Sequence, residues 1–154
     1  MHQWIVFGHI LGALLFMLAH GASAAVVFRL RRERDPDAVR VLLGLSGMTI
    51  PFLYLGLLLL IGAGLWAGMS GGWFSAGALW LWASIVLLVV ILGAMYGLLT
   101  PAFKRLRETV GDGSAPVDQG ALDRALAAPG PMMGAGIGLV GVLLILWLMV
   151  LKPF

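Results

Sequence analysis

Four long apolar runs divide this chain of 154 residues. They cover roughly residues 4–28, 41–69, 74–100 and 131–151, and each has the length of about 20 residues that a helix needs to cross a bilayer. A backbone in hydrocarbon must satisfy its own hydrogen bonds, so only helices and closed barrels span membranes. The runs therefore predict an all-α fold, a four-transmembrane-helix bundle that forms one membrane domain over residues 1–154.

The charged residues lie between these runs rather than within them. They make up 11% of the chain, against about 25% in soluble domains, and nearly all of them fall in the first and third connecting segments. The second connecting segment, residues 70–78, carries no charge. Because basic residues beside spans stay in the cytoplasm, the pattern predicts an N-out/C-out protein of the bacterial cytoplasmic (inner) membrane.

The basic residues have two interpretations besides topology. A net charge of +3 in clusters beside spans does not predict binding of nucleic acid. Arg31, Arg32 and Arg34 could meet anionic lipid head groups, but such a cluster more often only orients the neighbouring spans. We therefore interpret these arginines as topology signals, with the lipid bilayer itself as the first partner of the chain.

Local signals predict where helices begin and end. Asp35 followed by Pro36 is typical of an N-cap with proline at the first helical position, so the second helix should begin there. Pro51 lies within that helix and is expected to kink it, whereas Pro101 is expected to close the third span. Residues 118–128 predict a short interfacial helix in the third connecting segment.

Glycine pairs at GxxxG spacing occur along the spans, namely Gly8/Gly12, Gly64/Gly68, Gly93/Gly97 and Gly134/Gly138. Small residues at this spacing let helix backbones approach closely in a membrane. The first interpretation is tight packing within one bundle. Because the pairs exceed what one bundle requires, they also predict a homo-oligomer or membrane partner subunits, an assembly that leucine at Gly134 and Gly138 should loosen.

The only side chains expected inside the spans that titrate near neutral pH are histidines of the first helix. His2, His9 and His20 are separated by 7 and 11 residues, and at about 100° per residue they fall near one line along that helix. Titratable groups in hydrocarbon are costly and usually face a bundle interior or a cavity. Because neutral imidazole binds haem iron, copper and zinc, His9 and His20 are the candidate cofactor ligands, and His2, at the interface, should be dispensable.

Two methionines are predicted at the same membrane depth as His20. Met48 should lie about 10 Å from the cytoplasmic edge, Met95 about 9 Å and His20 about 12 Å from it. Thioether and imidazole together suit copper(I), and they are also a haem ligand pair. His9, His20, Met48 and Met95 are therefore a candidate metal site, although methionine also serves as apolar filler in helices.

Other chemistry has no support in the sequence. The spans contain no carboxylate, no serine–histidine–acid set and no phosphate-binding loop, and the chain has no cysteine. A bis-histidine haem needs ligands from two helices, yet no histidine follows the first helix. A second ligand would therefore come from a second copy or a partner subunit, and we do not expect the chain to be an enzyme on its own.

The first helix resembles a group of small bacterial membrane proteins. The segment His9-Ile-Leu-Gly12 after Trp4, and an arginine cluster that starts at Phe28-Arg29, are similar to the DUF2269 family, to copper-resistance D-like proteins and, more remotely, to the HemJ type of protoporphyrinogen oxidase. The resemblance covers most of the chain in topology but few specific residues. It implies a four-helix bundle in which a histidine near the outer end of helix one binds copper or haem.

Three functional hypotheses follow. The first is a protein that binds haem b or another redox cofactor through His9 and His20 and takes part in electron transfer. The second is a non-catalytic accessory subunit of a larger membrane complex, and the third is a copper-binding or copper-handling protein. The alignment of the histidines favours a cofactor, whereas the lack of a histidine on any later helix favours the accessory subunit. A transporter is least favoured, because the spans lack other charged groups.

Overall fold

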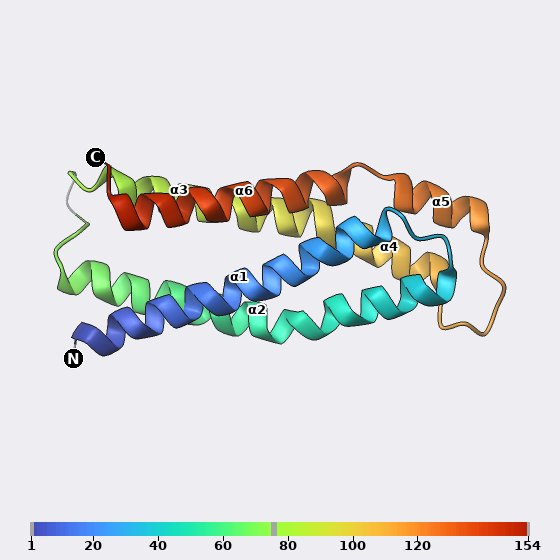
Figure 1. The fold of residues 1–154 in the computed structure, drawn as a ribbon, viewed down its shortest axis with the longest axis horizontal. Helices are drawn as coiled ribbons and strands as arrows, with labels where there is room; N and C mark the ends of the chain where they lie inside the picture. Colours follow the sequence, from blue (N-terminus) through green and yellow to red (C-terminus); the bar gives the residue numbers. More distant parts are fainter. Residues whose placement is uncertain (1, 75–76, 154) are drawn as a thin grey trace.

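Helices are the only regular secondary structure among the residues that the computed structural model describes, which are 2–74 and 77–153 (Figure 1). Four helical stretches are long and apolar enough to cross a membrane: Gln3–Leu30, Pro36–Ser70, Leu79–Val110 and Gln119–Leu151. The predicted all-α, four-span architecture is therefore confirmed.

Two helical hairpins make up the molecule (Figure 1). The first consists of α1 (His2–Leu30) and α2 (Pro36–Ser70). In the second, α3 (Leu79–Ala94), the short π-helix η1 (Met95–Leu99) and α4 (Thr100–Val110) follow one another without a break. The chain then returns through α5 (Gln119–Ala127) and α6 (Gly130–Leu151).

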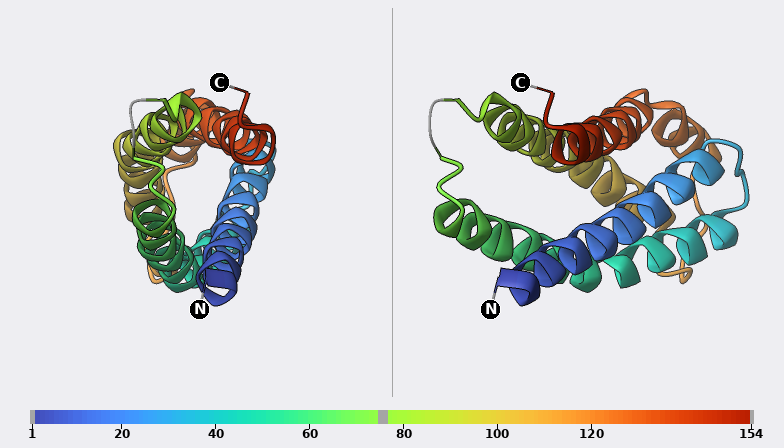
Figure 2. Two further views of the ribbon diagram at one scale, coloured as in Figure 1. Left: turned by 90° about the vertical axis from the view of Figure 1, so that its left-hand side faces the viewer. Right: turned by 60° about the vertical axis from the view of Figure 1, so that its left-hand side comes forward.

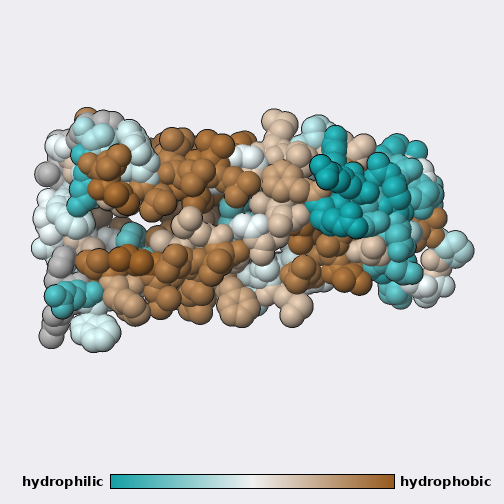
Figure 3. Space-filling view, in the orientation of Figure 1, coloured by the Kyte–Doolittle hydropathy of each residue, from teal (hydrophilic) through white to brown (hydrophobic). Residues whose placement is uncertain are grey.

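The hairpins converge at one end of the molecule and diverge at the other. α1 packs along α2, and α6 packs along α3 and η1, while α1 reaches α6 over only part of its length. Figure 2 shows the hairpins separating toward the end where α1 begins and α6 ends. Figure 3 shows the surface hollowed between two apolar layers at this end. We call this half of the molecule the open half.

The main core lies at the converging end. Val27, Val39, Leu106 and Leu122 are almost completely buried there and belong to one cluster contributed by α1, α2, α4 and α5. Leu106 and Leu122 lie outside the predicted spans, and their burial shows that α4 and α5 form a packed layer beneath the bundle rather than loose connections. This layer fixes how the two hairpins meet.

The predicted helix starts are confirmed. The Asp35 side chain accepts a hydrogen bond of 3.0 Å from the Asp37 backbone N–H, and Pro36 is the first residue of α2. At α5, the Asp118 side chain accepts one of 3.1 Å from the Ala121 backbone N–H. Both carboxylates satisfy N–H groups that a helix end leaves without a partner.

The expectation that Pro101 closes the third span is wrong, because the helix continues to Val110. Proline has no N–H, so Pro101 cannot donate to the carbonyl of Gly97 one turn earlier. The chain passes this position through η1, where the Thr100 N–H donates to the Met95 carbonyl in the wider π-helical pattern. α2 likewise continues through Pro51.

The orientation of the protein in the membrane stays a prediction. The charged connecting segments lie at the end opposite the start of α1 and the end of α6 (Figure 3). The chain has no cysteine, so one introduced cysteine per variant can show on which side of the membrane each end of the molecule lies. We expect a membrane-impermeant maleimide to label Gly77→Cys in intact cells, and Ala115→Cys only after permeabilisation, since both positions are exposed. The reverse labelling pattern would contradict an N-out/C-out topology.

Candidate functional site

His20 lies in the contact between α1 and α6. Its side chain is 2% exposed and stacks on Phe16, with ring centroids 5.9 Å apart and planes 4° apart. On the other side, a Cβ added at Gly138 of α6 would lie well inside 3.0 Å of the imidazole, a distance that real Cβ atoms essentially never reach. Glycine at 138 is therefore what allows α6 to close over His20.

Neither ring nitrogen of His20 has a hydrogen-bond partner among the described residues. Buried polar atoms nearly always have one, because burying them without a partner is costly. Nε2 is directed at Gly138, so a metal ion on this nitrogen requires α6 to move. In this arrangement, His20 packs between α1 and α6. Its role as a cofactor ligand stays a prediction.

His9 lies in the contact between α1 and α2. Its Nδ1 is 2.9 Å from the carbonyl oxygen of Leu60, and its ring covers Gly64, where an added Cβ would lie 2.9 Å from Nδ1. A carbonyl only accepts hydrogen bonds, so Nδ1 carries the proton and Nε2 of the neutral ring keeps a free lone pair. Histidines that bind metals commonly donate a hydrogen bond in this way from the nitrogen that does not bind.

The two histidines do not form one site. They are aligned along α1, but His9 contacts α2 while His20 contacts α6. Eleven residues of helix separate them by about 16 Å. Because α1 crosses from its partner α2 toward α6, side chains on one line of the helix meet different neighbours. The side chain of His2 lies outside the described part of the structure.

The candidate metal site of His9, His20, Met48 and Met95 is not assembled. Met48 is 71% exposed on the outer surface of α2, away from the buried surroundings of His20. Met95 is half-buried in η1, which packs mainly on α6 rather than on α1. Within residues 2–74 and 77–153, no group of three or more histidine, aspartate or glutamate side chains could hold a metal ion. Matched depth predicted this set, but depth carries no information about which way a side chain faces.

A polar contact between α1 and α2 lies one turn from His20. The Ser23 hydroxyl is 3.0 Å from that of Thr49, and the Thr49 hydroxyl donates to the Ser46 carbonyl at 2.8 Å. Since Thr49 has one proton, the Ser23 hydroxyl donates to Thr49. This pair was not predicted from the sequence, although hydroxyl residues in two apolar runs are a known signal for hydrogen bonds between membrane helices.

Three of the four GxxxG pairs pack within the chain. Gly12 meets the α2 backbone, Gly64 meets His9, and Gly134 meets Leu99. The expectation that leucine at Gly134 and Gly138 would loosen an assembly of subunits is therefore corrected, because both glycines pack against side chains of the same chain. Only the pair Gly93/Gly97 has no described atom within 4 Å of an added Cβ. Association with other subunits stays a prediction.

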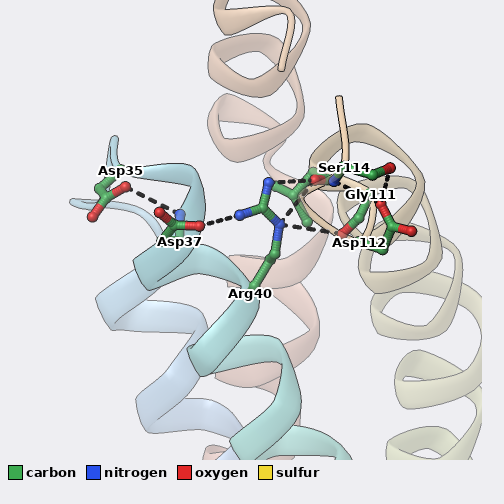
Figure 4. A network of polar contacts seen from close by, with 7 residues as sticks. Asp35, Asp37, Arg40, Gly111, Asp112 and Ser114 are labelled. Atoms are coloured by element: carbon green, nitrogen blue, oxygen red, sulfur yellow. Dashed lines mark hydrogen bonds and ion pairs between the residues drawn. The ribbon is translucent and has the colours of Figure 1, made fainter. Parts of the chain in front are cut away.

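Arginines at the charged end cap the helices there. Arg40 donates to the Val110 carbonyl from Nε at 3.0 Å and from Nη2 at 2.8 Å, and it pairs with Asp37 (Figure 4). Arg31 donates to the Ala127 carbonyl at 2.7 Å. Carbonyls at a helix C-terminus lack partners and attract positive charge. Arg40 therefore holds the end of α4 in place, and Arg31, interpreted from the sequence as a topology signal, also holds the end of α5.

The segment after α4 is closed by a local turn. The Asp112 carboxylate accepts hydrogen bonds from the Ser114 hydroxyl at 2.5 Å and from the Ser114 N–H at 2.9 Å (Figure 4). These bonds favour the charged carboxylate and lower the pKa of Asp112. The turn lies at the exposed charged end, so it shapes the connection between α4 and α5 and takes no part in the intramembrane sites.

The chain belongs to the DUF2269 family. The family, described as a predicted integral membrane protein, matches residues 3–153. No curated protein and no solved structure matches the chain. The resemblance to DUF2269 drawn from the first helix is confirmed, and the protein is an integral membrane protein with four candidate spans.

Proposed function

We propose that this four-span member of the DUF2269 family binds haem b through His9, as a subunit of a redox complex in the bacterial inner membrane. The observation that carries the proposal is the hydrogen bond from His9 Nδ1 to the Leu60 carbonyl. It orients the ring and leaves the lone pair of Nε2 available to iron. Haem held by imidazole passes single electrons between partners.

The position of His9 supports this assignment. His9 is half-buried and belongs to the N-terminal third of α1. Helix α1 begins at the end of the molecule where the hairpins diverge (Figure 2). His20, by contrast, is enclosed between Phe16 and Gly138. We therefore assign the iron ligand to His9, and we assign His20 to the contact that holds α1 against α6.

The second axial ligand would come from another chain. The sequence contains three histidines, all in the first helix, and His9 and His20 are too far apart to serve one iron. A second copy of the protein or a partner subunit would supply the missing ligand. This makes the protein a component of a complex rather than an enzyme on its own, and it accounts for the predicted association with other subunits.

Haem is favoured over copper because the methionine and histidine side chains that would bind copper(I) do not lie together in one site. Copper(I) handling would use methionine beside histidine, but Met48 faces outward with 71% of its surface exposed. A cofactor-free accessory subunit is the second candidate. The exposed pair Gly93/Gly97, with no described neighbour within 4 Å, favours it as a surface where another helix could approach.

The proposal is tested by the haem content of purified variants, measured as the pyridine haemochrome per chain. We expect His9→Ala to lose most of the haem, because it removes the iron ligand. His20→Leu should keep it, since leucine retains most of the buried volume, and His2→Ala should keep it as well. Equal haem in His9→Ala and the native chain, or selective loss in His20→Leu, would contradict the assignment.

A further inference from the structure

A groove of about 690 Å³ lies between two segments that are distant in the sequence. One wall comes from η1 and α4, and the other from α5 and the start of α6. Its lining is apolar at one end and polar at the other. The apolar part includes Gly97, Leu98 and Pro101, and the polar part includes Arg105, Glu108 and Arg124.

The groove crosses from the apolar part of the membrane span to its charged end. Gly97 and Leu98 precede Lys104, the first charged residue of the Leu79–Val110 rod. Arg105 lies eight residues beyond Gly97, which is about 12 Å along the helix. The two ends therefore differ in depth in the way that the acyl chains and the head group of a phospholipid differ.

The polar end of the groove is basic. Arg105 and Arg124 come from different helices, and neither forms an ion pair in the part of the chain that the structure describes. The one carboxylate of the lining, Glu108, lies 3.9 Å from the Lys104 ammonium. Two guanidinium groups thus remain for a ligand, and their planar array of donors matches the oxygens of a phosphate group.

We propose that this groove binds an anionic glycerophospholipid. The phosphate lies between Arg105 and Arg124, and an acyl chain follows the apolar wall past Pro101 and Gly97. Charge and depth favour a lipid over a partner helix, because the positive charge sits at the interface end and the apolar lining continues into the span. The site is independent of His9 and of any haem, so it does not rest on the proposed function.

Native mass spectrometry of the detergent-solubilised protein tests the site with two lipids of the same acyl composition, palmitoyl-oleoyl-phosphatidylglycerol and palmitoyl-oleoyl-phosphatidylcholine. We expect the native chain to prefer phosphatidylglycerol. The double variant Arg105→Gln/Arg124→Gln should bind it about 30-fold more weakly. A matched control, Arg29→Gln/Arg32→Gln, changes the net charge equally at the same end of the molecule but outside the groove, and it should keep the preference.

A second pair of variants tests the apolar wall without changing charge. Gly97→Phe fills the apolar end of the groove, whereas Gly93→Phe places the same side chain outside the groove lining, one turn earlier on the rod. We expect only Gly97→Phe to weaken lipid binding. Undiminished binding by Arg105→Gln/Arg124→Gln, or equal losses in both arginine double variants, would overturn the proposal. So would equal lipid binding by the two phenylalanine variants.

Discussion

Gly12→Ala should destabilise the protein more than alanine at either of the other two glycines of α1, Gly8 and Gly21. A Cβ at Gly12 would lie 2.8 Å from the Leu59 carbonyl carbon and 2.9 Å from the Gly56 carbonyl oxygen, and closer still to the Leu60 nitrogen. All three are backbone atoms of α2, so no side chain can rotate away. The helices must separate along the largest interface of the bundle. We expect a loss of about 3 kcal/mol in the free energy of unfolding, the upper part of the range for overpacking.

Gly21→Ala is the matched control for this change. Gly21 belongs to the same helix, and no described atom lies within 4 Å of an added Cβ. Its variant should match the native stability or exceed it slightly, because alanine favours the helix over glycine. In thermal unfolding followed by tryptophan fluorescence in detergent, we expect Gly12→Ala to lower the Tm by about 10 °C. Equal Tm values for the two variants would show that α1 and α2 do not cross at Gly12.

Gly138→Ala should separate α6 from α1. The new methyl group would overlap the imidazole of His20, which is 2% exposed and held against Phe16. A Cβ at this distance from the ring cannot be accommodated in place, so α6 or the ring must shift. We expect a loss of about 2 kcal/mol, smaller than at Gly12 because a side chain yields more easily than a backbone. Gly136→Ala on the same helix has no described atom within 4 Å and should be neutral.

A double-mutant cycle identifies the cause of that loss. His20→Ala alone leaves a cavity, and Gly138→Ala alone creates an overlap. In the double variant the new methyl group enters the space that the imidazole leaves. In unfolding experiments, the double variant should therefore lose less free energy of unfolding than the sum of the two single variants, by about 1 kcal/mol or more. Strict additivity would mean that His20 does not contact Gly138.

The sequence predicts the spans and the helix starts because their signals are local. A run of apolar residues is recognisable without its neighbours, and Asp35 and Asp118 cap helices through N–H groups two or three residues away. The end of the third span could not be predicted in the same way. A proline such as Pro101 normally ends a helix, but here the π-helical turn before it lets the helix continue. The buried residues of α4 stabilise this continuation because they pack into the core.

The candidate site was only partly predictable, because its partners are set by how the helices cross. Helical periodicity places His9 and His20 on one line of α1, but it does not reveal that α1 passes from α2 to α6 between them. Leu60 binds His9 through its backbone carbonyl, and Gly138 makes room for the His20 ring because it has no Cβ. Neither contact involves a polar side chain of the partner residue, so the residue type does not reveal it. Met48 is predicted at the same depth as His20, but it is 71% exposed whereas His20 is buried, since depth does not determine direction around a helix.

The most direct test of the central proposal is the reduced-minus-oxidised absorption spectrum of the native protein, isolated gently with the subunits that accompany it. A haem b bound through His9 predicts a Soret band and an α-band on reduction that co-elute with the chain. Metal analysis of the same sample should find iron rather than copper. A preparation that retains its partners but shows neither haem bands nor bound iron would contradict the proposal, and the accessory-subunit function would then replace it.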